Sequence, residues 1–173
     1  MSYCQPVTTT LRRLLMPVLL TLVLAATVGC DRVTKRIAVQ TLAGMPARTL
    51  FGGTVTLVYA ENAGGFLSLG ADLAPTARTV VFVGATGLFL VLVLAAIVRH
   101  RGSVWSRLGA TLFLAGGASN WIDRFAHGRV VDFLNLGVGS LRTGVFNVAD
   151  VAILAGVALL VFDEFVRPRS ASL

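Results

Sequence analysis

The chain has 173 residues, of which 55% are hydrophobic and 13% are charged, and its mean hydropathy is +0.81. A soluble domain carries roughly 25% charged residues, so this composition excludes an ordinary soluble domain and indicates a membrane protein. The net charge of +7 comes from scattered basic residues. Beyond that charge the sequence has no nucleic-acid-binding signal, and we expect no nucleic-acid partner.

Four apolar runs are each long enough, at about 20 residues, to cross a bilayer of roughly 30 Å. They cover approximately residues 13–30, 79–98, 106–123 and 148–166. We therefore predict a membrane α-helical fold with four transmembrane helices in a single polytopic domain, residues 1–173. The loop 31–77 between the first two helices is large enough to hold some structure of its own.

The basic residues orient these helices. In a four-helix topology both termini and the 99–105 connection share one side of the membrane, and cytoplasmic segments carry an excess of Lys and Arg. These short stretches hold seven of the fifteen basic residues, namely Arg12, Arg13, Arg99, Arg101, Arg107, Arg167 and Arg169. We expect both termini in the cytoplasm and the loop 31–77 on the outer face.

The first apolar run also has features of a cleavable export signal. It ends in Thr27-Val28-Gly29-Cys30, which is similar to the box at which bacterial lipoproteins are lipidated and cut. Exported lipoproteins are soluble after their anchor, whereas this chain continues with three more apolar runs, so we expect a retained helix. Cys4 and Cys30 lie at opposite ends of that run and predict no internal disulfide. Neither cysteine, nor His100 or His127, has metal-ligand spacing, and we expect no metal site.

The loop after the first run carries two motifs. Asp31 and Lys35 are spaced at i and i+4, which indicates either a local salt bridge or part of a site. The alternating, β-branched segment at 54–62 predicts a strand. Asn62-Ala63-Gly64-Gly65 then predicts a turn, either an ordinary hairpin turn or a loop that contacts substrate. Pro75 ends the loop.

The third run becomes polar at its end. Asn120, Asp123 and Arg124 are spaced at i, i+3 and i+4, on one face of a helix. We interpret Asp123 and Arg124 as a pair that holds the third helix against the fourth. Three small residues, Ala115, Gly116 and Ser119, provide a surface for close helix packing in lipid.

Two further aspartates frame the start of the last run. Asp132 lies among Val130, Val131 and Phe133, and an apolar setting would raise its pKa by desolvation; the alternative is a solvated loop residue. Asn147 predicts a helix N-cap with Asp150 at the N3 position. Asp150 is therefore either a helix cap or, together with Asp132, one half of an acid/base pair.

The predicted topology places all of these polar residues at one face of the membrane, although they come from five separate places in the sequence. Ionisable residues at or inside a bilayer are costly and indicate a functional site. The expected site comprises Asp31, Lys35, Asn62, Asn120, Asp123, Arg124, Asp132, Asn147 and Asp150.

In this order, the motifs resemble the bacterial lipoprotein signal peptidases (signal peptidase II). The match comprises DRVTK at 31–35, NAGGF at 62–66, SNWIDR at 119–124, GRVVDF at 128–133 and FNVAD at 146–150. The resemblance implies four transmembrane helices with a small extracytoplasmic β-rich cradle between the first two. It also implies an aspartic endopeptidase of the bacterial inner membrane, with its active site near the outer face.

The resemblance assigns roles to particular residues. Asp132 and Asp150 fall where the family has its catalytic pair. The residues that match supporting or substrate-contacting positions are Asp31, Lys35, Asn62, Gly64, Asn120, Asp123, Arg124 and Asn147. The chain departs from the family pattern where Phe66 arrives one residue early, and where Thr143-Gly144-Val145 replaces the usual proline before Phe-Asn.

The implied substrates are diacylglyceryl-modified prolipoproteins, cut on the N-terminal side of the lipidated cysteine, without metal or cofactor. We expect a monomer whose partners are these substrates and membrane lipid. One alternative is a divergent paralogue with a specialised substrate or a role in inhibitor resistance. Others are a small proton-relay or transport protein and a structural membrane subunit.

Overall fold

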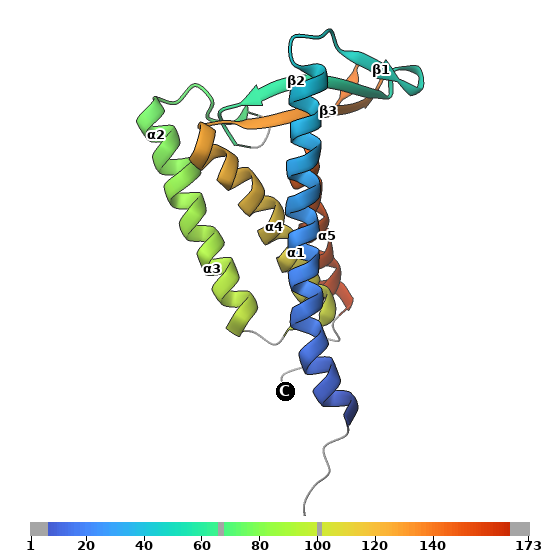
Figure 1. The fold of residues 1–173 in the computed structure, drawn as a ribbon, viewed down its shortest axis with the longest axis vertical. Coiled ribbons are helices and arrows are strands. Elements are labelled where there is room, and N and C mark those ends of the chain that lie inside the picture. The colour runs from blue at the N-terminus through green and yellow to red at the C-terminus, as the bar shows by residue number, and fades with distance from the viewer. Residues whose placement is uncertain (1–6, 66–67, 100–101, 167–173) are drawn as a thin grey trace, which may run out of the picture.

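The computed structural model describes residues 7–65, 68–99 and 102–166. Long helices stand side by side, and a small antiparallel sheet lies across one end of them (Figure 1). The elements are α1 (Val7–Leu42), β1 (Arg48–Leu50), η1 (Phe51–Gly53), β2 (Val55–Asn62), α2 (Pro75–Thr79), η3 (Val80–Ala85), α3 (Thr86–Arg99), α4 (Val104–His127), β3 (Val130–Val138), β4 (Leu141–Arg142) and α5 (Val148–Val166). Several residues used above lie outside the described ranges: Cys4, Phe66, His100, Arg101, Arg167 and Arg169.

Helix α1 is longer than the sequence predicted. The expectation that it ends at residue 30 is wrong, because α1 continues through the lipoprotein-like box to Leu42. Residues 31–42 contain neither glycine nor proline, and the first helix breaker is Gly44, with a φ of 72°. The Asp31–Lys35 motif therefore lies on a helix, where both side chains are buried.

The other predicted helices appear close to their expected places. The second begins earlier, at Pro75, and runs continuously through α2, η3 and α3 to Arg99. Within its π-helical turn η3, the carbonyl of Val83 accepts a 2.8 Å hydrogen bond from Trp121 Nε1 of α4. Among the described residues, two helices are long and apolar enough to cross a membrane, Leu15–Leu42 and Pro75–Arg99.

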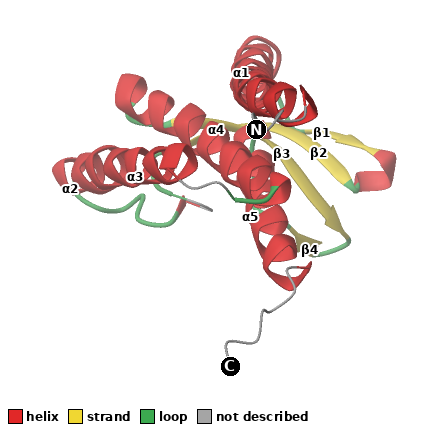
Figure 2. Cartoon of the chain, turned by 90° about the horizontal axis from the view of Figure 1, so that it is seen from below, coloured by secondary structure: helices red, strands yellow, loops and turns green. Residues whose placement is uncertain are grey.

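Helix α4 is the central helix of the group. It packs against α1, α3 and α5, as the view along the helices shows (Figure 2). Its contact with α5 is made through glycines: a Cβ on Gly109 would lie 2.8 Å from the carbonyl oxygen of Gly156. A Cβ on Gly116 would collide with the carbonyl oxygen of Ala149. The expected small surface on this helix is confirmed, and the two backbones approach closely because of it.

The sheet has the strand order β1-β2-β3-β4 within the described ranges, with antiparallel neighbours. The predicted strand at 54–62 is confirmed as β2. Leu57 pairs with Leu134, but Ala60 pairs with Asp132, so β2 contains a one-residue bulge between Leu57 and Ala60. After Asn62 the chain leaves the sheet for α2, so the reading of residues 62–65 as a hairpin turn is wrong.

Candidate active site

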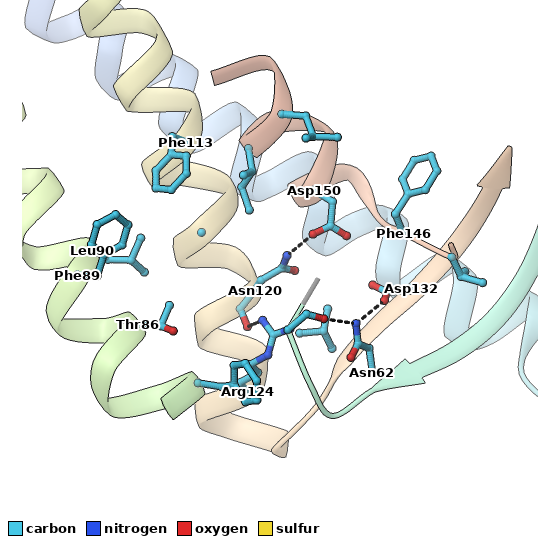
Figure 3. Close-up of a pocket in the computed structure, with 17 residues that line it drawn as sticks. Asn62, Thr86, Phe89, Leu90, Phe113, Asn120, Arg124, Asp132, Phe146 and Asp150 are labelled. Atoms are coloured by element: carbon cyan, nitrogen blue, oxygen red, sulfur yellow. Dashed lines mark hydrogen bonds between the residues drawn. The ribbon is translucent and has the colours of Figure 1, made fainter. Parts of the chain in front are cut away.

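Two carboxylates meet where the sheet joins the helices. Asp132 lies on β3 and Asp150 lies in the first turn of α5 (Figure 3). Asp132 Oδ1 accepts a 2.6 Å hydrogen bond from Asn147 Nδ2, and its Oδ2 accepts one of 3.1 Å from Asn62 Nδ2. Asp150 Oδ1 accepts a 2.9 Å bond from Asn120 Nδ2. Each carboxylate is therefore fixed by side-chain amides that come from other elements.

Asn147 connects the two carboxylates. Its Oδ1 accepts a 3.0 Å hydrogen bond from the backbone N–H of Asp150, and its own N–H donates to Asp150 Oδ2 at 3.1 Å. This reciprocal pair is a capping box, so the predicted N-cap is confirmed. Asp150 is thus a helix cap that also faces the cavity described below, and the two interpretations of this residue do not exclude each other.

A buried lysine neutralises the carboxylates behind this pair. Lys35 Nζ lies 2.7 Å from Asp31 Oδ2, 2.8 Å from Asp123 Oδ2 and 2.7 Å from Asn120 Oδ1. All three donors of the ammonium group are used, which a buried charge requires. Asp123 Oδ1 also accepts from Arg32 of α1.

Asp31 ties three helices together. Its side chain is completely buried. Its Oδ2 accepts a 2.7 Å bond from Ser119 Oγ of α4, and its Oδ1 accepts a 2.9 Å bond from the backbone N–H of Ala149 in α5. An anion at the N-terminus of α5 satisfies a backbone donor that has no partner within the helix, and the helix dipole favours it.

Arg124 holds the turn that follows β2. Its Nε donates to the carbonyl oxygen of Gly64 at 3.0 Å and its Nη2 donates to the same atom, while its guanidinium lies 5.6 Å from the centre of the Phe82 ring. The expected Asp123–Arg124 pair between the third and fourth helices is wrong. Asp123 joins α4 to α1, and Arg124 joins α4 to the turn.

Gly64 is required by space in that turn. A Cβ there would lie 2.5 Å from the carbonyl oxygen of Leu69. Its N–H donates at 2.9 Å to Asn62 Oδ1, while Asn62 Nδ2 also donates at 2.9 Å to the carbonyl oxygen of Gly65. The turn thereby orients the amide that contacts Asp132.

The surroundings of Asp132 favour its protonated form. Burial, and then the nearby Asp150 carboxylate, raise the pKa of Asp132 from 3.8 to about 6, although the hydrogen bonds from Asn62 and Asn147 oppose the shift. The side chain is only 4% exposed, so the reading of Asp132 as a solvated loop residue is wrong.

A cavity of about 400 Å³ opens in front of the two carboxylates. Asn62, Asn120, Arg124, Asp132 and Asp150 form its polar end (Figure 3). The remainder is largely apolar and is lined by Phe82, Phe89 and Leu90 of the α2–α3 segment, Phe113 of α4, Phe146, and Ile153 and Leu154 of α5. The volume lies within the range of small-molecule sites, and the shape joins a polar reaction centre to an apolar compartment.

The structure brings together all ten residues expected at the site, including Gly64, in one connected set of hydrogen bonds and ion pairs. The role of Arg32 and the apolar walls of the cavity were not predicted from the sequence. Phe89 and Leu90 carry no sequence signal, since α3 is apolar on every side. Within the described residues, no group of three or more His, Cys, Asp or Glu side chains could hold a metal ion.

Comparisons with known proteins identify the family of the chain. The sequence model of the family described as signal peptidase (SPase) II matches residues 23–166. Proteins named lipoprotein signal peptidase are similar: that of Burkholderia mallei (strain SAVP1) is 36% identical over 144 residues, 82% of this chain and 84% of the relative. That of Burkholderia ambifaria (strain MC40-6) is 39% identical over 121 residues, 68% of this chain and 69% of the relative.

Solved structures share the fold. A bacterial membrane enzyme structure obtained by the in meso method superimposes with a TM-score of 0.73 at 21% identity, covering 89% of this chain and 93% of that one. A second such structure has a TM-score of 0.72 at 22% identity. With the family match over most of its length, this chain belongs to the signal peptidase II family, a family of peptidases.

Proposed function

We propose that this chain is an aspartic endopeptidase that removes signal peptides from diacylglyceryl-modified prolipoproteins, cutting before the lipidated cysteine. Asp132 and Asp150 are the catalytic pair. The observation that carries the proposal is the placement of both carboxylates, each held by amides, at the polar end of a cavity whose remainder is apolar. Such a cavity suits a substrate with a peptide bond next to lipid chains.

The reaction follows from two carboxyl groups that share one proton, because two adjacent carboxylates do not both ionise at low cost. One carboxylate takes a proton from a water molecule that attacks the scissile carbonyl. The other donates its proton to the developing oxyanion. Asn62, Asn120 and Asn147 keep the two carboxyl groups oriented throughout, since each donates to one of them.

The membrane arrangement is part of the proposal. Because α4 and α5 pack beside α1 and α3, all four helical segments cross the inner membrane, with the sheet on the outer face and both termini in the cytoplasm. The enzyme acts as a monomeric single domain. In a Cys4→Ser, Cys30→Ser background, a Ser140→Cys variant should react in whole cells with a membrane-impermeant thiol reagent, and protection of that residue would contradict the topology.

The decisive experiment is a cleavage assay on a diacylglyceryl-modified prolipoprotein peptide, with wild type, Asp132→Asn and Asp150→Asn in detergent. Losing either carboxyl group should lower the rate by at least about 10²- to 10⁴-fold. Asp72→Asn is the matched control, since Asp72 is an exposed carboxylate outside the cavity. Thermal unfolding should show all three variants folded. Substantial turnover by either active-site variant would contradict the catalytic pair, and no cleavage by folded wild type would contradict the proposed function.

A further inference from the structure

A second cavity, of about 460 Å³, lies on the opposite side of the β2–β3 pair from the candidate active site. The first cavity is lined by Asn62, Val130 and Asp132, and the second by their neighbours along the chain, Glu61, Arg129 and Val131. Successive residues of a strand point to opposite faces. The outer turns of α1 and the end of α4 complete the second cavity.

The lining of this cavity is mainly cationic. Its charged residues are Arg32, Lys35, Arg36 and Arg129 against Glu61 and Asp123. Lys35 is fully occupied by buried partners. Arg129 is 55% exposed and makes one ion pair, of 3.1 Å, with Glu61.

Arg36 provides positive charge that the protein itself leaves uncompensated. It is exposed and, among the described residues, has neither an ion pair nor a hydrogen bond. Arg32 also lines the cavity and commits only Nη1 to Asp123, so its other donors have no hydrogen-bond partner among the described residues. Guanidinium groups arranged in this way suit a phosphate, which accepts several charge-assisted hydrogen bonds at once.

The position of the cavity in the fold indicates where the phosphate comes from. Arg32 and Arg36 directly follow the apolar part of α1, at the level where α5 begins and where Asp31 contacts Ala149. Val33 and Ile37 on the adjacent face of α1 are 55% and 51% exposed. A phospholipid with its headgroup in the cavity could lay its acyl chains along this exposed apolar face.

We propose that this cavity binds the phosphate of an anionic phospholipid of the outer leaflet, with Arg36 and Arg129 as its main donors. The lipid would hold the outer turns of α1 and the sheet at the membrane surface, on the side of β2–β3 away from the reacting carboxylates. The inference rests on the proposed membrane arrangement but not on the peptidase activity, since no residue of the catalytic pair lines this cavity.

The test is a binding titration of the full-length chain in mild detergent, followed by native mass spectrometry. The probes are dioleoylphosphatidylglycerol, dioleoylphosphatidylcholine and inorganic phosphate. The phosphatidylglycerol should bind about tenfold more tightly than the phosphatidylcholine, because the choline cation of the latter offsets the phosphate charge that the arginines recognise. Equal affinity for the two lipids would overturn the proposal. Displacement of the lipid by millimolar inorganic phosphate would overturn it as well, because the site would then recognise the free ion.

Matched variants locate the site. Arg36→Gln and Arg129→Gln should each weaken phosphatidylglycerol binding several-fold, and the double variant about tenfold or more. Arg48→Gln removes the same charge from an exposed arginine of β1 that does not line the cavity, and it should bind like wild type. Arg36 has no bonded partner to lose, so the single variant should keep the thermal stability of wild type. An equal loss of binding in Arg48→Gln would contradict the assignment to this cavity.

Discussion

Helix α4 has two contrasting sides. Toward α5 it presents Gly109 and Gly116, so that the two backbones touch and no larger side chain fits. Toward α3 it packs loosely. In the described part of the chain, Leu90 is the only buried residue of α3, and its side chain lies against Gly117. The catalytic candidates are fixed to the tight side, and the apolar cavity opens on the loose side. In the proposed function, the placement of the carboxylates and the access of a lipidated substrate therefore depend on different helix pairs.

The largest expected effect comes from the charge cluster by which α1 holds α4 and the start of α5. Lys35→Met would leave Asp31 and Asp123 buried without their cation, which should cost about 3–5 kcal/mol in the free energy of unfolding. Arg32→Met is the matched control, because Arg32 also pairs with Asp123 but its side chain is 36% exposed. That loss should be about 1 kcal/mol or less. Thermal unfolding in detergent measures the stability of both variants. Similar losses of stability in the two would contradict the burial of the Lys35 cluster.

The second prediction tests the backbone contact between α4 and α5. Gly116→Ala would force a methyl group against the carbonyl of Ala149, and overpacking of this kind should cost about 1–3 kcal/mol. Gly29→Ala in α1 is the control: no atom lies within 4 Å of its added Cβ, and alanine is the better helix former. Gly29→Ala should unfold at the wild-type temperature or slightly above. A Gly116→Ala protein as stable as wild type would show that the contact between α4 and α5 can accommodate a larger side chain.

The third prediction concerns the pH dependence of cleavage, which tests Asp132 between the tight and the loose side. The pKa of Asp132 is raised to about 6, so its proton persists up to that pH and is lost above it. If the pair must share one proton, kcat/KM should fall as pH rises through about 6, by up to about tenfold per pH unit. A cleavage profile between pH 4.5 and 8.5 measures this.

A variant sharpens the pH assignment. The hydrogen bond from Asn62 favours the charged form of Asp132. Asn62→Ala should therefore move the alkaline limb to higher pH while lowering the maximal rate. A limb that stays in place, or moves to lower pH, would assign it to a group other than Asp132.

The smallest expected effect belongs to the loose side. Phe89 lines the cavity and is already 50% exposed, so Phe89→Ala should leave the unfolding temperature nearly unchanged. It should raise KM for the lipidated peptide roughly fivefold, the equivalent of about 1 kcal/mol of lost apolar contact. Leu88→Ala, on the adjacent exposed surface outside the cavity, should change neither quantity. Equal changes of KM in the two variants would mean that the lipid chains of the substrate do not bind in this cavity.

The sequence predicted the elements well where hydrophobic length and capping decide them. Helix α5 spans Val148–Val166 as expected, since Asn147 and Asp150 form its capping box. The end of α1 was missed because Asp31 and Lys35 resemble the polar end of a membrane helix. They are in fact buried by partners that are distant in sequence: Asp31 accepts from Ser119 and Ala149. Lys35 donates to Asn120 and Asp123.

The site itself was predictable as a set of residues but only partly as a set of contacts. Carboxylates and amides among apolar residues draw attention whatever their partners. The partner of Arg124 was missed because it is the backbone carbonyl of Gly64, and such an acceptor has no signature in the sequence. The apolar cavity walls were missed for a related reason, since a helix such as α3 shows no preferred face in its own sequence.

The bulge in β2 decides which residues contact Asp132, one of the two candidate catalytic carboxylates. Leu57 pairs with Leu134, and strict alternation would then set Tyr59 opposite Asp132 and turn Asn62 to the far face. One extra residue resets the count, so that Ala60 stands opposite Asp132 and Asn62 reaches its Oδ2. Deleting one residue between Leu57 and Ala60 would remove the bulge and still leave Ala60 opposite Asp132, with Asn62 on the same face of the strand. Regular pairing of the full sequence would instead turn Asn62 toward the second cavity, so the extra residue decides which cavity receives the amide.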